Sequence, residues 1–135
     1  AAARAMRSVG GEITGVVPSF FRESEVELLY QDCTAVIWTE TMRERKAIME
    51  EKSDAFVVVP GGIGTFEEAF EILTLKHLGR HDKPIAFYDV AGYFEPFREL
   101  MENGINRGFI HPRDRSIFRI TEDPYETIAY LEGRG

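Results

Sequence analysis

One segment constrains the fold of this chain more than any other: an apolar run that leads through a glycine-rich turn into a helical pattern. Residues 54–59 (DAFVVV) are almost entirely apolar, which is typical of a parallel strand buried on both faces. Three glycines follow within residues 60–65 (PGGIGT), and residues 65–78 then adopt a helical period that Gly79 ends. A contiguous strand, glycine turn and helix predicts an α/β unit built on a parallel sheet.

The rest of the sequence continues this alternation of strands and helices. The patterns predict further strands over residues 12–17, 34–38, 84–88 and 116–120, and helices over residues 1–11, 42–52, 93–106 and 124–131. We therefore predict a Rossmann-like, doubly wound, mostly parallel sheet with helices on both faces. The length of 135 residues fits one domain over residues 1–135.

Composition excludes several classes of partner. The net charge of −7 and the scattered basic residues predict that the chain does not bind nucleic acid. The longest apolar runs, residues 55–60 and 85–88, are too short to span a membrane. The single cysteine, Cys33, excludes an internal disulfide, predicts a cytoplasmic protein and is expected as a small core residue on a strand.

The glycine turn has the composition of a phosphate site. Ligands of doubly wound folds bind at the carboxyl ends of the strands, where a helix start presents backbone N–H groups and a positive dipole end. Gly61, Gly62 and Gly64 permit tight or positive-φ backbone and remove Cβ atoms that would keep an oxyanion away, and Thr65 can cap the helix or bind the phosphate. The alternative is an ordinary tight turn. The spacing matches neither a Walker A loop nor a dinucleotide fingerprint.

Charged residues surround this turn. Glu67 and Glu68 are expected in the first turn of the helix, with Glu71 on the same side as Glu68. A carboxylate there can hold a water molecule or stabilise positive charge on a sugar, or it can simply complement the helix dipole. Arg45 and Lys46 lie in the preceding predicted helix, where they bind an anion or form a solvated surface.

These residues resemble a known family. The motif Met42-x-x-Arg45-Lys46, followed by Pro60-Gly61-Gly62-x-Gly64-Thr65-x-x-Glu68, resembles the paired signature of the LONELY GUY (LOG) family, the cytokinin riboside 5′-monophosphate phosphoribohydrolases formerly labelled lysine decarboxylases. Residues 71–94 are also similar to the family's downstream helix and strand. The resemblance covers the chain from about residue 10 onward.

The resemblance implies a Rossmann-like homodimer, or a larger homo-oligomer, that needs no cofactor and no metal. It implies that the enzyme hydrolyses the N-glycosidic bond of a nucleoside 5′-monophosphate, either a cytokinin riboside or an AMP-like substrate, to free base and ribose 5-phosphate. Arg45 and Glu68 are then the catalytic pair. The implied substrate-binding residues are Met42, Lys46, Gly61, Gly62, Ile63, Gly64, Thr65, Glu67 and Thr74.

The chain also departs from the family. Nothing here matches the strand, helix and second glycine-rich segment with which the family begins, and residues 1–11 open within an Ala-rich helical segment, so we expect earlier elements to be missing. Leu75 replaces a tryptophan that many members carry, and residues 19–25 do not follow the plant pattern, so the preferred base stays open.

Three other functions compete with this interpretation. A non-catalytic nucleotide sensor or carrier would use the same loop, although a pure anion site gains nothing from nearby carboxylates. A pyridoxal phosphate enzyme would need Lys46 as its Schiff base, but that lysine follows an arginine on a charged helix. A metal site would draw on His77 and His81, but Gly79 interrupts their helix.

Overall fold

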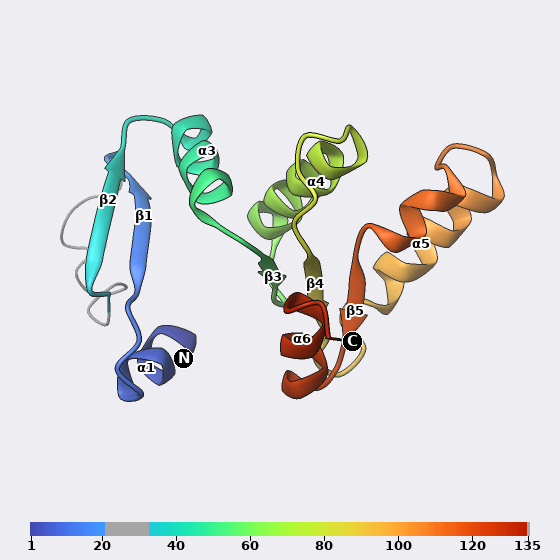
Figure 1. Cartoon of the computed structure of the whole chain (residues 1–135). Helices are drawn as coiled ribbons and strands as arrows, with labels where there is room; N and C mark the ends of the chain where they lie inside the picture. The colour runs from blue at the N-terminus through green and yellow to red at the C-terminus, as the bar shows by residue number, and fades with distance from the viewer. Residues whose placement is uncertain (21–32, 135) are drawn as a thin grey trace. The chain divides into compact units, whose positions relative to one another are not determined.

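Strands pair in parallel wherever the structure describes them, as the sequence predicts. The computed structural model describes residues 1–20 and 33–134, and the chain divides into two compact units, Ala1–Lys52 and Ser53–Gly135. The first unit holds the parallel pair β1-β2, and the second holds the parallel sheet β3-β4-β5 (Figure 1). The chain therefore has the α/β architecture of a Rossmann-like, doubly wound fold.

The first unit is a short parallel pair with one helix packed on it. It contains α1 (Ala2–Ser8), β1 (Thr14–Pro18), β2 (Ala35–Thr39) and α3 (Met42–Lys52), and α3 packs against both strands. Pro18 is the last residue of β1, where a missing N–H costs the ladder least. The predicted helix over residues 42–52 is confirmed with the same bounds.

Local hydrogen bonds set the start of α3. The hydroxyl of Thr41 accepts from the backbone N–H of Glu44 at 3.1 Å, and the carboxylate of Glu44 accepts from the N–H of Glu40 at 3.0 Å. This reciprocal arrangement resembles a capping box, which satisfies N–H groups that the helix itself leaves without acceptors. The side chains of Thr41 and Glu44 thus fix the position where α3 begins.

The second unit supplies most of the core. Its helices and strands are β3 (Phe56–Val58), α4 (Ile63–His77), β4 (Ile85–Tyr88), α5 (Glu95–Asn106), the 3₁₀ turn η1 (Pro112–Ser116), β5 (Arg119–Thr121) and α6 (Pro124–Leu131). Asp123 caps α6 by accepting from the N–H of Glu126 at 3.0 Å, and Pro124 occupies its first position. The predicted helix over residues 124–131 is confirmed with these bounds.

An aromatic cluster lies between the sheet and helices α4 and α5. Phe87, in β4, is 1% exposed, and its ring centroid lies 5.2 Å from that of Phe94, 4.5 Å from that of Phe97 and 5.5 Å from that of Phe118. Burying one such side chain stabilises the fold by about 1.5–3 kcal/mol. Ala69 and Leu73 bring α4 onto the same cluster.

Helix α6 covers the opposite face of this sheet. Successive strand residues point to opposite faces, so Ala86 points away from the cluster that contains Phe87. On that side the buried hydroxyls of Thr121 in β5 and Thr127 in α6 share a hydrogen bond of 2.7 Å, and Arg119 lies over the ring of Tyr130 with 4.6 Å between its Cζ and the centroid. Helices therefore lie on both faces, as predicted.

Three local predictions are wrong. The segment 54–59 is not buried on both faces: only Phe56–Val58 pair with β4, and Val57 is 48% exposed because α6 packs on β4 and β5 instead. The strand predicted over residues 116–120 is displaced to β5, because η1 occupies the preceding residues. Cys33 is not a core residue on a strand, since it precedes β2 and is only partly buried.

Within the described ranges, no helix combines the length and the apolar character that crossing a membrane requires.

Candidate functional site

The start of α4 presents a row of backbone donors that the helix itself does not use. Gly62 is the N-cap, and the first intrahelical bond runs from the N–H of Phe66 to the carbonyl of Gly62 at 3.2 Å. The N–H groups of residues 62–65 therefore have no acceptor within the helix. Unlike α3, α4 carries no acidic residue in its first turn. Donors and a positive dipole end thus meet directly after β3, which favours an anion.

The three glycines of this turn have different structural roles. A Cβ at Gly61 would lie 2.2 Å from Oγ1 of Thr65, so the side chain of Thr65 occupies the space that glycine leaves. At Gly62 and Gly64, by contrast, an added Cβ would meet no atom of the second unit within 4 Å. None of the three has positive φ, so of the two backbone roles expected for these glycines the positive-φ one is wrong and the tight turn remains. Gly62 and Gly64 thus leave open space at the positions where side chains would lie.

Two expectations about this helix need correction. Thr65 is not the cap: α4 begins at Ile63, so Thr65 lies inside the first turn and packs on Gly61. Glu67 and Glu68 lie in the second turn, because the helix begins two residues earlier than the sequence pattern suggests. Complementation of the helix dipole fades beyond the first turn, so it explains these carboxylates less well there.

Glu68 lies one helical turn beyond Gly64 and on the same side of the helix. Side chains on a helix lean toward its N-terminus, so a residue at i+4 covers the surface above residue i. Gly64 has no side chain to fill that surface. Glu68 is half-buried whereas Glu67 is exposed. Glu68 is therefore the carboxylate best placed to reach a ligand bound at the start of α4.

Two other predicted site residues of α4, Ile63 and Thr74, lie at different distances from the glycine turn. Ile63, the first residue of the helix, is 85% exposed and offers apolar surface next to the donors. Thr74 lies 11 residues further along, roughly 16 Å down the helix axis. Its hydroxyl donates to the carbonyl of Phe70 at 2.7 Å. The structure thus groups Ile63 with the glycine turn and does not bring Thr74 to it.

The remaining predicted residues belong to the first unit. Met42 is the first residue of α3 and is 40% exposed. Arg45 donates from Nε to the carbonyl of Val16 in β1 at 2.9 Å, which fixes the position of its side chain and uses one of the five donors of the guanidinium. Lys46 follows it and is half-buried. The predicted site residues therefore divide between the two units.

Sequence reasoning missed the loop between β4 and α5. Asp89 directly follows β4, is 5% exposed, and accepts from the N–H of Phe94 at 2.9 Å. The hydroxyl of Tyr93 donates to the carbonyl of Gly61. The available signal was positional, because polar residues that follow a strand of a parallel sheet lie at the edge where ligands bind.

The histidines have structural partners. Nδ1 of His77 lies 2.9 Å from the buried carboxylate of Asp114, and Nε2 of His81 lies 2.9 Å from the carbonyl of Ile72. Nδ1 of His111 accepts from the N–H of Arg113 at 3.1 Å. Over residues 1–20 and 33–134, no group of three or more potential ligands could hold a metal ion.

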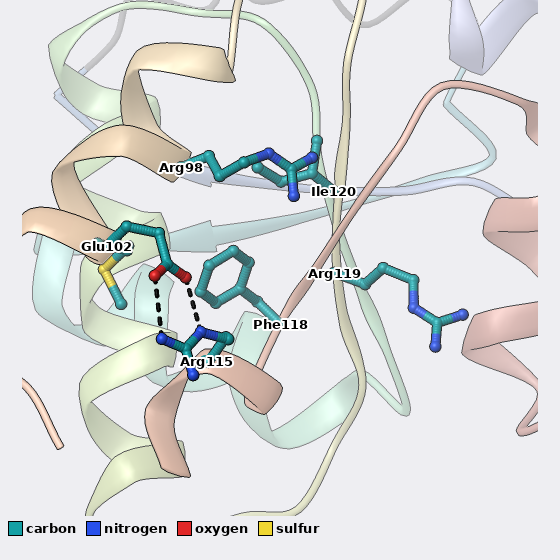
Figure 2. A pocket seen from close by; sticks show the side chains of 7 residues that line it. Arg98, Glu102, Arg115, Phe118, Arg119 and Ile120 are labelled. Atoms are coloured by element: carbon teal, nitrogen blue, oxygen red, sulfur yellow. Dashed lines mark hydrogen bonds and ion pairs between the residues drawn. The ribbon is translucent and has the colours of Figure 1, made fainter. Parts of the chain in front are cut away.

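A separate cavity of about 220 Å³ lies between α5, η1 and β5 (Figure 2). The guanidinium of Arg115 donates two hydrogen bonds to the carboxylate of Glu102, at 2.7 and 3.0 Å. These bonds lower the pKa of Glu102 and raise the pKa of Arg115. Arg98 lies 3.3 Å from Glu95. No residue of the glycine turn lines this cavity.

The parallel α/β architecture and the exposed helix start after β3 place the chain among the Rossmann-like α/β proteins. Comparison with known sequences identifies the family within this class. The profile of the family described as "possible lysine decarboxylase" matches residues 1–131. The chain belongs to this family.

Relatives carry a more specific name. A cytokinin riboside 5′-monophosphate phosphoribohydrolase of Mycobacterium tuberculosis (strain ATCC 25618 / H37Rv) is 43% identical over 112 residues, which cover 83% of this chain and 59% of that protein. The enzyme of the same name from Rhodococcoides fascians is 38% identical over 96% of this chain and 65% of its own length. LOG5 of Arabidopsis thaliana is 34% identical, with 96% and 56% covered. The resemblance to the LOG family is confirmed, and the chain spans 56–65% of the length of these three relatives.

The family description suggests a pyridoxal phosphate enzyme, and the residues present do not fit that cofactor. A Schiff-base lysine needs an apolar or cationic environment that lowers its pKa. Lys46 lies on α3, of which no residue is fully buried and whose sequence, MRERKAIMEEK, is rich in charge of both signs. The surroundings of Lys46 therefore do not support pyridoxal phosphate chemistry.

Proposed function

We propose that the protein containing this chain hydrolyses the N-glycosidic bond of a nucleoside 5′-monophosphate and releases free base and ribose 5-phosphate. The observation that carries the proposal is the start of α4, where backbone donors lie beside two glycines with open space at their Cβ positions and a carboxylate follows one turn later. The names of the relatives, which specify a cytokinin riboside 5′-monophosphate, support this substrate class.

The 5′-phosphate would bind to the N–H groups of residues 62–65. Each N–H that donates to a charged oxygen contributes about 1.5–3 kcal/mol, and the dipole of α4 adds to this attraction. Because Gly62 and Gly64 lack side chains, phosphate oxygens can approach the backbone closely. The ribose would then extend from the phosphate along the side of α4 that carries Glu68.

Glu68 would act at C1′ of that ribose. As the bond between C1′ and the base nitrogen breaks, positive charge develops on the sugar, and a carboxylate nearby stabilises it. A water molecule adds to C1′ and loses one proton, for which Glu68 is the base, while the departing nitrogen gains one proton. A carboxylate near a phosphate weakens phosphate binding through like-charge repulsion, so its presence favours a catalytic site over a simple carrier.

The direct test is incubation of the protein with a panel of nucleoside 5′-monophosphates, including AMP and isopentenyladenosine monophosphate, with chromatography of the products. We expect free base and ribose 5-phosphate in equal amounts. Tight binding of a nucleotide without any release of base would instead identify a non-catalytic sensor or carrier.

The glycine turn yields a prediction that separates binding from folding. Gly64→Ala places a methyl group where the second unit leaves space, in a helix position that favours alanine over glycine by up to about 1 kcal/mol. We expect unchanged or slightly higher stability in urea. We expect the KM for nucleoside monophosphate to rise at least about tenfold, since one charged hydrogen bond or more is lost.

Gly61→Ala is the contrasting variant. Its Cβ would collide with Thr65 inside the protein, so stability and substrate affinity should fall together. An unchanged KM in Gly64→Ala would show that no ligand approaches the start of α4.

Arg45 yields a second prediction. Arg45→Ala removes the guanidinium and its bond to Val16, so we expect both kcat and substrate affinity to fall, with kcat/KM lower by at least about 100-fold, as for loss of a charged group that contacts the transition state. The lost hydrogen bond should cost only about 1 kcal/mol of stability. Arg43→Ala, an exposed change on the same helix, is the matched control and should retain activity. Equal kinetics for the two variants would remove Arg45 from the site.

Other features stay predictions from the sequence. They are the single domain over residues 1–135, the homodimer or larger homo-oligomer, the cytoplasmic location, and the contacts of Met42, Lys46, Glu67 and Thr74 with the substrate.

A further inference from the structure

We propose that Tyr93 is a positioning residue that orients the glycine turn for phosphate. This inference rests on the proposed function, because it assigns the turn to a phosphate group. Tyr93 lies in the loop between β4 and α5, 32 positions from Gly61, and its hydroxyl donates to the Gly61 carbonyl. The sequence motifs of the site do not include it.

The geometry of the peptide bond explains why this contact matters. In a trans peptide the carbonyl of one residue and the N–H of the next point in opposite directions, and the chain contains no cis peptide among its described residues. A hydroxyl that holds the Gly61 carbonyl therefore directs the N–H of Gly62 to the opposite side, away from Tyr93. That N–H is the first of the four donors at the start of α4.

Glycine needs such a restraint more than other residues. Gly61 and Gly62 lack the Cβ atoms that limit rotation in other residues, so the peptide between them can turn over at low energy. The side chain of Thr65 restrains Gly61 on one side, because it fills the position of the missing Cβ. The Tyr93 hydroxyl restrains the carbonyl. Together these contacts fix the direction of a peptide that its own residues leave free.

The ring of Tyr93 contacts two other aromatic rings. It stacks on Phe66 with 6.4 Å between centroids and an angle of 7° between planes, and it meets buried Phe94 edge-on at 5.2 Å. Phe66 belongs to α4, so the same helix whose donors face the ligand also supports the ring. Tyr93 as a whole is 45% exposed, and its hydroxyl reaches the glycine turn.

Two hydrogen bonds, one of them to the sheet, hold the backbone around Tyr93. The carboxylate of Asp89 holds the N–H of Phe94 at 2.9 Å, and the N–H of Asp89 donates to the carbonyl of Thr121 in β5 at 2.7 Å. Between them, Ala91 has φ 54° and Gly92 has φ 77°. A left-handed alanine is strained and persists only where the surrounding structure enforces it. The fold thus imposes a particular conformation on the loop that delivers the hydroxyl.

The test is Tyr93→Phe, which removes the hydroxyl and keeps the ring. Calorimetric titration with ribose 5-phosphate should show a Kd about five- to tenfold higher than that of the unmodified protein, the effect of weakening one hydrogen bond to a charged group. Titration with ribose, which lacks the phosphate, should show no difference between the two proteins. The KM for nucleoside monophosphate should rise by a similar factor, and kcat should change less than twofold.

Tyr125→Phe is the matched control, since Tyr125 is 86% exposed on α6 and loses the same atom. A purely structural role for Tyr93 would lower the urea midpoint and kcat together and leave the Kd for ribose 5-phosphate unchanged; that result overturns the inference. An unmodified protein that does not bind ribose 5-phosphate also overturns it. If ribose 5-phosphate binding weakens in Tyr93→Phe but no substrate releases base, the positioning role stands and the proposed hydrolysis fails.

Discussion

Replacing Glu68 with glutamine should reduce kcat about 100- to 10,000-fold, the range that general acid–base catalysis contributes, while the enzyme still binds its substrate. The amide keeps the shape of the side chain but neither accepts a proton nor stabilises positive charge on the sugar. Removal of a negative charge near the phosphate should leave the Kd for AMP unchanged or lower it. Single-turnover kinetics and calorimetry measure the two quantities separately.

The control for this variant is Glu99→Gln, which makes the same change at an exposed position of α5. It should match the unmodified protein in kcat and in Kd. Full activity of Glu68→Gln would remove the catalytic assignment, and a large increase in its Kd would make Glu68 a binding residue instead.

Replacing Phe87 with alanine should lower the free energy of unfolding by about 3–5 kcal/mol. Phe87 is 1% exposed and contacts three other aromatic rings, so its removal leaves a cavity that rigid neighbours fill poorly. Domains are stable by only about 5–15 kcal/mol, so this loss is a large share of the total. Urea unfolding followed by far-UV circular dichroism measures it.

Phe109→Ala is the control, because Phe109 is 86% exposed and should change the stability by less than about 0.5 kcal/mol. The single tryptophan, Trp38, lies in β2 of the first unit. Its fluorescence therefore shows whether a defect in the second unit also unfolds the first. A loss below about 1 kcal/mol in Phe87→Ala would mean that the aromatic cluster is not the main core.

The sequence predicts helices best where their ends are marked locally. Helices α3 and α6 have the predicted bounds, because Thr41 and Asp123 cap them and Pro124 fixes the start of α6. Helix α4 begins two residues before the prediction, since its N-cap is Gly62, which has no side chain to mark it. β5 is displaced because η1 depends on the contact of Asp114 with His77, 37 positions away.

The same distinction applies to the candidate site. The motifs show the glycine turn and the glutamates because these residues are adjacent in the chain. Tyr93 and Asp89 act through contacts across loops, and no local pattern reveals that the Tyr93 hydroxyl reaches Gly61. The different roles of Gly61 and Gly64 are likewise visible only in the structure, which shows that the side chain of Thr65 lies against Gly61 while the Cβ position of Gly64 is open.

The C-terminal end of α4 is held by contacts of two histidines. His77, its last residue, is bound to buried Asp114, and the ring of His81 returns to the carbonyl of Ile72, so the helix is secured at the end opposite the glycine turn. A helix fixed in this way loses little further freedom when an anion docks at its start, since the ordering is completed during folding. Such preorganisation strengthens affinity without any added contact. The second unit should therefore keep nearly the same backbone whether it is empty or occupied.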